Sequence, residues 1–171
     1  MLEHLWNGWR ATYVGGVPSA DAASEESGSV FTQILASGMT DAEVNIVWRG
    51  THCFAILNAY PYSTGHLLVL PYREVAALEE LDAAEAQELW AAVTDAVRAV
   101  KAAYRPEGVN VGINLGRPAG GSVSQHIHVH VVPRWTGDSN FMTSVANTRT
   151  LPEPLVDTAA RLRDAWPRQH A

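Results

Sequence analysis

The sequence predicts an α+β domain with a mainly antiparallel, five-stranded sheet, one long helix and shorter helices. Short apolar runs typical of strands recur along the chain, the first two are joined by a hairpin-length link, and one long stretch repeats its apolar residues every three or four positions. Parallel strands would each need a longer crossover connection. The 171 residues amount to 18.5 kDa, which fits one domain of ordinary size.

The N-terminal half of the domain is expected to contain a helix followed by a hairpin. Residues 30–37 carry apolar side chains at helical spacing, which predicts a short amphipathic helix. Two apolar runs, 44–49 and 52–58, are separated by Gly50 and Thr51, and this pattern is typical of paired strands.

A third strand and the long helix follow. The strand over 65–70 is stopped by Pro71. Asp82 and Glu85 have the spacing of a capping box, so the long helix should begin there, and Pro106 should end it.

The last elements are two strands and a short helix. The strands are expected over 109–115 and 126–132, the second stopped by Pro133. Pro152 and Pro154 precede a short, polar C-terminal helix.

These elements divide the chain into three parts. Residues 1–28 are interpreted as an N-terminal segment and linker, because their last third is rich in Ala, Ser, Glu and Gly. Residues 29–151 form the predicted domain, and residues 152–171 the C-terminal helix and tail.

Composition excludes several classes of partner. The formal net charge is −6 and no basic stripe is present, so no nucleic-acid partner is expected. No apolar run approaches the ~18 residues of a membrane-spanning helix, so no membrane association is expected. The single cysteine, Cys53, forbids an intrachain disulfide and suits a reducing cytoplasm, the expected location.

Three histidines alternate with apolar residues in one predicted strand: His126, His128 and His130. Because successive side chains of a strand point to opposite faces, the three imidazoles should share one face. The intervening Ile127, Val129 and Val131 should face the long helix. Neighbouring imidazoles lower one another's pKa, so at least one should stay neutral at pH 7 and act as a nucleophile or base.

Two other interpretations of the histidines stay open. They could be solvated side chains on a sheet face, although strict alternation over a β-branched back face disfavours this. They could also bind a metal ion. His126 and His130 would lie about 13 Å apart at Cα, too far to share one tetrahedral ion. No carboxylate precedes the histidines within ten residues, so catalysis is the stronger hypothesis.

The segment before the histidines, residues 114–125, is rich in glycine and in hydrogen-bond donors. Glycines allow backbone N–H groups to turn inward around an anion. The side-chain donors there are Asn114, Ser122, Ser124 and Gln125. By itself the segment is an ordinary glycine-rich turn, but beside a histidine strand it favours nucleophilic catalysis at a phosphate.

The histidine segment resembles a motif of a known protein family. The string His126–Val132 resembles the His-φ-His-φ-His-φ-φ motif of the HIT (histidine-triad) superfamily of nucleotidyl hydrolases and transferases. Residues 65–71 and 109–116 resemble two further strands of that family, and the similarity spans roughly residues 30–152. Residues 132–142 look like the corresponding segment of a bacterial subgroup of the family. Within that subgroup, residues 58–62 and 120–122 look most like the diadenosine tetraphosphate phosphorylases of actinobacteria.

The resemblance implies a two-step reaction. His128 would attack the α-phosphorus of a dinucleoside polyphosphate and form an adenylyl-histidine intermediate. Inorganic phosphate would then remove the AMP group, so that diadenosine tetraphosphate yields ATP and ADP. A hydrolase that uses water as acceptor, and a nucleotide-binding regulatory module with an inactive site, are the alternatives. The resemblance also implies a homodimer or higher homo-oligomer.

The resemblance assigns roles to further residues. His130 would contact the phosphate under attack, with His126 and His66 in a hydrogen-bonded network behind it. Asn58 would bind the ribose hydroxyls. Phosphate would be held by Asn114, Gly121 and Ser122, with Ser124 and Gln125 as further donors. A structural strand histidine is an equal alternative for His66, and turn capping is the alternative for Asn58.

Metal and cofactor expectations follow from the same resemblance. Many bacterial relatives carry a Cys-x-x-Cys zinc pair where this sequence has Ser29 and Thr32. We therefore expect no structural zinc and no obligatory cofactor. A divalent cation would enter only with the substrate polyphosphate.

Overall fold

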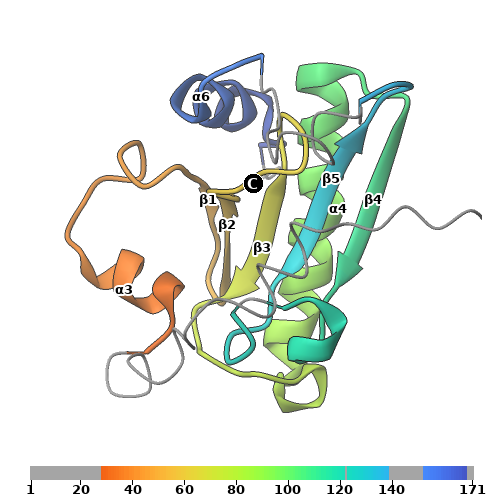
Figure 1. Cartoon of the computed structure of the whole chain (residues 1–171). Coiled ribbons are helices and arrows are strands. Elements are labelled where there is room, and N and C mark those ends of the chain that lie inside the picture. Colours follow the sequence, from red (N-terminus) through yellow and green to blue (C-terminus); the bar gives the residue numbers. More distant parts are fainter. Residues whose placement is uncertain (1–27, 122, 139–151, 169–171) are drawn as a thin grey trace, which may run out of the picture.

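A computed structural model describes residues 28–121, 123–138 and 152–168. Its centre is a five-stranded sheet in the order β1-β2-β3-β5-β4, in which all neighbouring strands are antiparallel. The strands are β1 (Ile46–Arg49), β2 (Cys53–Leu57), β3 (Leu67–Pro71), β4 (Gly108–Ile113) and β5 (Val129–Arg134). The predicted fold class is confirmed (Figure 1).

The helices are α3 (Val30–Ala36), α4 (Ala83–Tyr104) and α6 (Leu155–Ala165), with short 3-10 turns η1 (Leu78–Glu80) and η2 (Arg117–Ala119) that the sequence did not predict. The predicted capping box begins α4. The Asp82 carboxylate accepts the Glu85 N–H at 2.8 Å, and the Glu85 carboxylate accepts the Asp82 N–H at 3.0 Å. The helix ends at a left-handed residue, Arg105, directly before Pro106.

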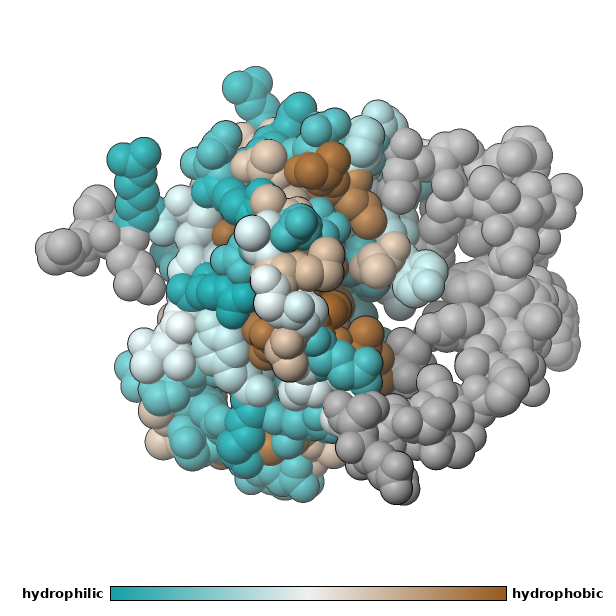
Figure 2. All heavy atoms as spheres, turned by 90° about the vertical axis from the view of Figure 1, so that its left-hand side faces the viewer, coloured by the Kyte–Doolittle hydropathy of each residue, from teal (hydrophilic) through white to brown (hydrophobic). Residues whose placement is uncertain are grey.

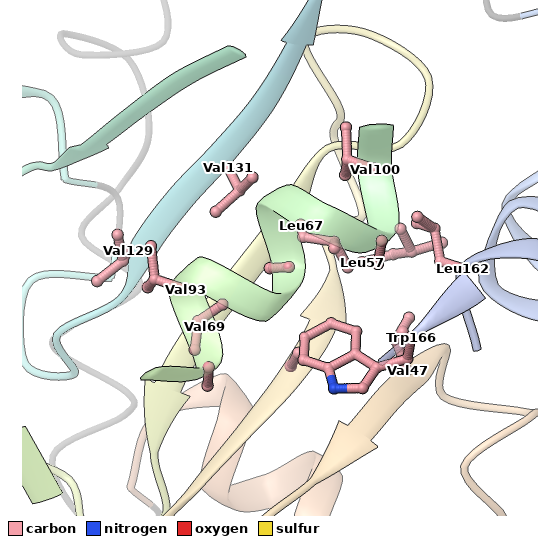
Figure 3. Packing of buried hydrophobic residues seen from close by; sticks show 14 of the residues in the cluster. Val47, Leu57, Leu67, Val69, Val93, Val100, Val129, Val131, Leu162 and Trp166 are labelled. Carbon is pink, nitrogen blue, oxygen red and sulfur yellow. The ribbon is translucent and has the colours of Figure 1, made fainter. Parts of the chain in front are cut away.

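The main core lies between the sheet and α4 (Figure 3). Alternate residues of the central strands face this helix: Ala55, Leu57, Leu67, Val69, Val129 and Val131. Helix α6 joins the same core through Leu162 and Trp166, whose indole stacks on Trp48 with ring centroids 5.4 Å apart. The prediction that Val129 and Val131 face the long helix is confirmed. Ile127 is buried but lies outside this core.

The opposite face of the sheet carries a second apolar cluster, which includes Phe31 of α3 and the strand residues Ile46, Phe54, Ile56, Leu68 and Leu70. Because strand side chains alternate, α3 and α4 pack against opposite faces. Figure 2 views the molecule from the side of α3 and shows a largely hydrophilic surface with hydrophobic side chains in separate patches. Val30 and Met39 are about half exposed.

Several strand boundaries differ from their predictions, most of all the start of β5. Pro71 and Pro133, which were expected to stop their strands, belong to β3 and β5. Strand β5 begins at Val129, so His126 and His128 precede it, and the expected strand over 126–132 is wrong at its start. The neighbouring strands both end their pairing at Val129, and the Ile127 N–H instead donates to the Val75 carbonyl at 2.7 Å. The histidine segment therefore leaves the sheet towards the chain that follows β3.

Within the described ranges, no helix has the length and apolar character that crossing a membrane would require.

Candidate active site

Four histidines gather on the sheet face that α3 covers. The His128 and His130 rings lie 5.0 Å apart at their centroids, and the His66 and His130 rings 5.2 Å apart. The ring centroid of Phe31 lies 5.5 Å from that of His126 and 5.5 Å from that of His128. His130 pairs with Leu68, which belongs to the second apolar cluster, so the histidines continue that cluster with polar side chains.

The geometry of His128 leaves one ring nitrogen available. Its side chain is buried, with 6% exposed, and Nδ1 lies 2.8 Å from the His126 carbonyl oxygen. A carbonyl only accepts hydrogen bonds, so Nδ1 carries the proton and Nε2 keeps its lone pair. Among the described residues, no hydrogen bond reaches Nε2. This nitrogen is therefore free to act as a nucleophile.

A chain of hydrogen bonds assigns the proton of His130. The Tyr62 N–H donates to Nδ1 of His66 at 3.1 Å, so neutral His66 carries its proton on Nε2. That Nε2–H donates to Nδ1 of His130 at 3.0 Å. Neutral His130 then has its proton on Nε2, which lies 3.3 Å from Nδ2 of Asn114. Because two donors cannot bond one another, this proton assignment requires the Asn114 amide to be turned over, so that its oxygen accepts. His130 is thus a neutral hydrogen-bond donor beside His128.

Burial favours the uncharged form of the three triad histidines. It lowers the pKa of His126 and His128, and together with the neighbouring His128 charge it lowers the pKa of His130 to about 4. The sequence predicted a neutral histidine because of mutual repulsion. In the structure, loss of solvent is the larger cause of the lowered pKa at all three triad histidines. Repulsion from His128 is the second cause at His130 only, and at His126 it is the smallest.

The donor-rich segment folds closely beside this cluster. Gly121 is buried, and a Cβ there would lie 3.2 Å from the Asn114 carbonyl oxygen, so glycine allows the segment to close on itself. Ser124 is half-buried, and Oε1 of Gln125 is buried with no hydrogen-bond partner in the described part of the chain. Ser122 lies outside the described residues. The phosphate-binding roles of these residues stay predictions.

Asn58 shows the turn-capping contact that was its alternative role. Its Oδ1 accepts the Tyr60 N–H at 2.9 Å, and its Nδ2 lies 3.4 Å from Nδ1 of His66. Its predicted contact with ribose stays a prediction.

Sequence reasoning missed the role of α3 in this site. Ser29, the N-cap of α3, places Oγ 2.7 Å from Nδ1 of His126, and Glu74 accepts the Ser29 N–H at 2.7 Å. A serine before an apolar helical run was a readable cap signal. The contact of this serine with a histidine 97 residues away could not be predicted from the sequence. Consequently His126 joins the other histidines through its backbone carbonyl and not through its ring.

The residues around Ser29 and His126 do not fit a structural zinc ion. Ser29, Thr32, Glu74 and His126 converge, but structural zinc is held by thiolates and imidazoles, and here two neutral hydroxyls stand in for the thiolates. Both hydroxyls already donate hydrogen bonds, Ser29 to His126 and Thr32 to the Ser29 carbonyl. The described residues contain no group of three or more His, Cys, Asp or Glu side chains arranged to hold a metal. The expectation of no zinc stays a prediction.

Comparison with known proteins agrees with the fold and the histidine cluster. The HIT domain family model matches residues 40–137, and the chain belongs to the HIT family. Over 170 residues it is 45% identical to a protein named AP-4-A phosphorylase from Mycobacterium tuberculosis (strain H37Rv), a match that covers 98% of this chain and 86% of that protein.

Two further matches are more distant. A bis(5'-nucleosyl)-tetraphosphatase (asymmetrical) of Schizosaccharomyces pombe is 34% identical over 93 residues, which are 54% of this chain and 50% of that protein. Among solved structures, a Zn-bound histidine triad family protein from Mycobacterium smegmatis superimposes with a TM-score of 0.65 at 27% identity, covering 80% of this chain and 91% of that one.

Proposed function

We propose that this chain is a diadenosine tetraphosphate (AP-4-A) phosphorylase that uses His128 as its nucleophile. The observation that carries the proposal is the protonation pattern of His128, whose Nδ1–H is held by a carbonyl and whose Nε2 is unpartnered among the described residues. The 45% identity to a protein of that name over nearly the whole chain supports this substrate.

In the first step, the Nε2 lone pair of His128 forms a bond to the α-phosphorus of the substrate. The bond from that phosphorus to the bridging oxygen breaks, and ATP leaves with the electron pair. The imidazole becomes positively charged, and the His126 carbonyl that accepts its Nδ1–H stabilises this charge. The Nε2–H of His130, beside His128, would exchange its Asn114 partner for a phosphoryl oxygen and donate to it.

In the second step, an oxygen of inorganic phosphate attacks the adenylyl phosphorus. The phosphorus–nitrogen bond breaks, its electron pair returns to Nε2 of His128, and ADP leaves. One set of donors serves both displacements, since the same phosphoryl group reacts twice. Asn114, Gly121 and Gln125 lie in the segment that would hold the entering phosphate, together with Ser122 and Ser124.

The nucleoside would lie against α3. Phe31 contacts two of the histidine rings, and the partly buried Ile34 and Leu35 pack on the second apolar cluster. An adenine base would stack along these side chains, and Asn58 would bind the ribose hydroxyls.

The proposed reaction needs no obligatory cofactor, and a divalent cation would enter with the polyphosphate. We place the reaction in the cytoplasm.

The Cys53 thiol is buried, and burial raises its pKa to about 12, so the thiol is a core side chain without a catalytic role.

Product analysis with isotopically labelled phosphate tests the proposal. Diadenosine tetraphosphate incubated with labelled phosphate should give ATP and ADP, with the label in ADP and not in ATP. A phosphate-independent reaction that yields ATP and AMP would assign the hydrolase alternative. A parent protein that binds the dinucleotide without turnover would assign the regulatory alternative.

We further propose that two copies of the chain pair through β4. This strand lies at one edge of the sheet (Figure 1), and Val111 on it is 44% exposed. An exposed apolar edge strand is a template for pairing with another chain. Sedimentation equilibrium should show a dimer that Val111→Lys dissociates, and a monomeric parent protein would contradict the pairing.

A further inference from the structure

Ser29 is a fully buried residue that links α3 to the active site. Its Oγ accepts the Thr32 N–H at 3.2 Å as the N-cap of α3 and lies 2.7 Å from Nδ1 of His126. The other nitrogen of that ring, Nε2, lies 2.9 Å from the Pro71 carbonyl oxygen and must therefore carry the proton. Nδ1 is then the acceptor, and the Ser29 hydroxyl donates to it.

Glu74 holds Ser29 in place. Its Oε2 accepts the Ser29 N–H at 2.7 Å and lies 3.3 Å from the Thr32 hydroxyl oxygen. Since Glu74 follows β3, it ties the start of α3 to the segment on which the His126 ring rests. The ring of His126 is thus bonded at both nitrogens, by α3 on one side and by the end of β3 on the other.

The carbonyl of the same His126 accepts the Nδ1–H of His128. We propose that Ser29, held by Glu74, is a positioning residue of the active site. By fixing the His126 ring, it holds the carbonyl that directs Nε2 of His128 towards the substrate. The inference rests on the proposed attack by His128. It also accounts for the mismatch with zinc, because in this chain hydrogen bonds make the connection between α3 and His126.

Kinetics of Ser29→Ala in the full chain test the proposal. The substitution leaves the nucleophile in place but frees the His126 ring, so kcat should fall roughly 10- to 100-fold with KM little changed, as for a small misplacement of a reacting group. The control is Ser37→Ala, which removes an exposed hydroxyl at the other end of α3 that bonds only local backbone. It should keep the parent kcat.

Loss of the N-cap by itself lowers stability, so rates are compared at a temperature where thermal unfolding shows both proteins folded. A second measurement does not depend on the reaction. Long-range ¹H–¹⁵N correlation of the imidazoles should find His126 protonated on Nε2 and His128 on Nδ1 in the parent protein, and a changed or mixed protonation pattern at both in Ser29→Ala.

Unchanged kcat together with unchanged imidazole spectra in Ser29→Ala would overturn the proposal. A parent protein without phosphorolysis would refute the proposed function alone, because the spectra still decide whether Ser29 fixes the two histidines. Should Ser29→Ala fail to fold, the parent spectrum decides: His126 protonated on Nδ1 would refute the hydrogen bond that Ser29 is assigned to donate, and protonation on Nε2 would support it.

Discussion

The two faces of the sheet use the same strands for different purposes. On the α4 face, Leu67, Val69, Val129 and Val131 are fully buried in an apolar core that contains Leu89 and Val100. On the α3 face, the neighbouring residues include His66, His128 and His130, which are buried or half-buried. His66 is hydrogen-bonded to His130, and His128 to the His126 carbonyl.

The difference shows how stability and chemistry are separated across one sheet. Apolar burial is non-directional, so the α4 face depends mainly on volume and packing. Burying an imidazole is unfavourable unless its nitrogens are hydrogen-bonded, so the α3 face depends on the direction of each proton. A substitution should therefore change stability on one face and turnover on the other.

The largest effect is expected for His128→Ala on the α3 face. It removes the proposed nucleophile, and loss of a covalent nucleophile costs at least about 10³-fold in kcat. Phosphate-dependent formation of ADP measures this loss, and circular dichroism should show an unchanged fold. Turnover equal to the parent would remove His128 from the mechanism.

Leu67→Ala on the α4 face is expected to have the next largest effect, and on stability instead of turnover. It leaves a cavity in the main core and should lower the free energy of unfolding by about 2–5 kcal/mol. Urea unfolding measures this change, and kcat per folded molecule should match the parent. A large fall in kcat without lost stability would break the separation of the two faces.

His66, the residue next to Leu67, allows a matched substitution on the α3 face. His66→Ala removes the donor to Nδ1 of His130 and leaves that nitrogen unpaired. His130 then loses the bond that fixes its proton on Nε2, so kcat should fall roughly 10-fold, while the unpaired buried nitrogen adds a stability cost of about 1–3 kcal/mol. Steady-state kinetics on diadenosine tetraphosphate check this, and an equal loss in Leu67→Ala would show that the two neighbours are not functionally distinct.

The smallest effect is expected from pH. Burial lowers the pKa of the three triad histidines from an ordinary value of 6.5, and that of His130 to about 4. Below pH 6.5 the unfolded chain binds more protons than the folded one, so the contribution of these neutral histidines to stability is complete above pH 6.5. This contribution to stability should be lost as the pH falls from 6.5 through about 4. Thermal unfolding at pH 8, 6.5 and 5 measures this, and His130→Gln should reduce the slope.

Much of the fold was readable because its signals are local. The period of the apolar residues located each strand and helix, and the capping box at Asp82 and Glu85 marked the start of α4 to the residue. The histidine motif and its preceding glycine-rich segment marked the candidate site for the same reason, since spacing along a chain is visible in one dimension.

Tertiary structure decided what depends on partners far apart in the chain. The start of β5 at Val129 depends on where its neighbouring strands end, which no periodicity within 126–132 records. The contact of Ser29 with His126 spans 97 residues, and that of His66 with His130 spans 64. Hydrogen bonds need both partners placed in three dimensions, so the protonation of each imidazole, and with it the free nitrogen of His128, followed only from the folded arrangement.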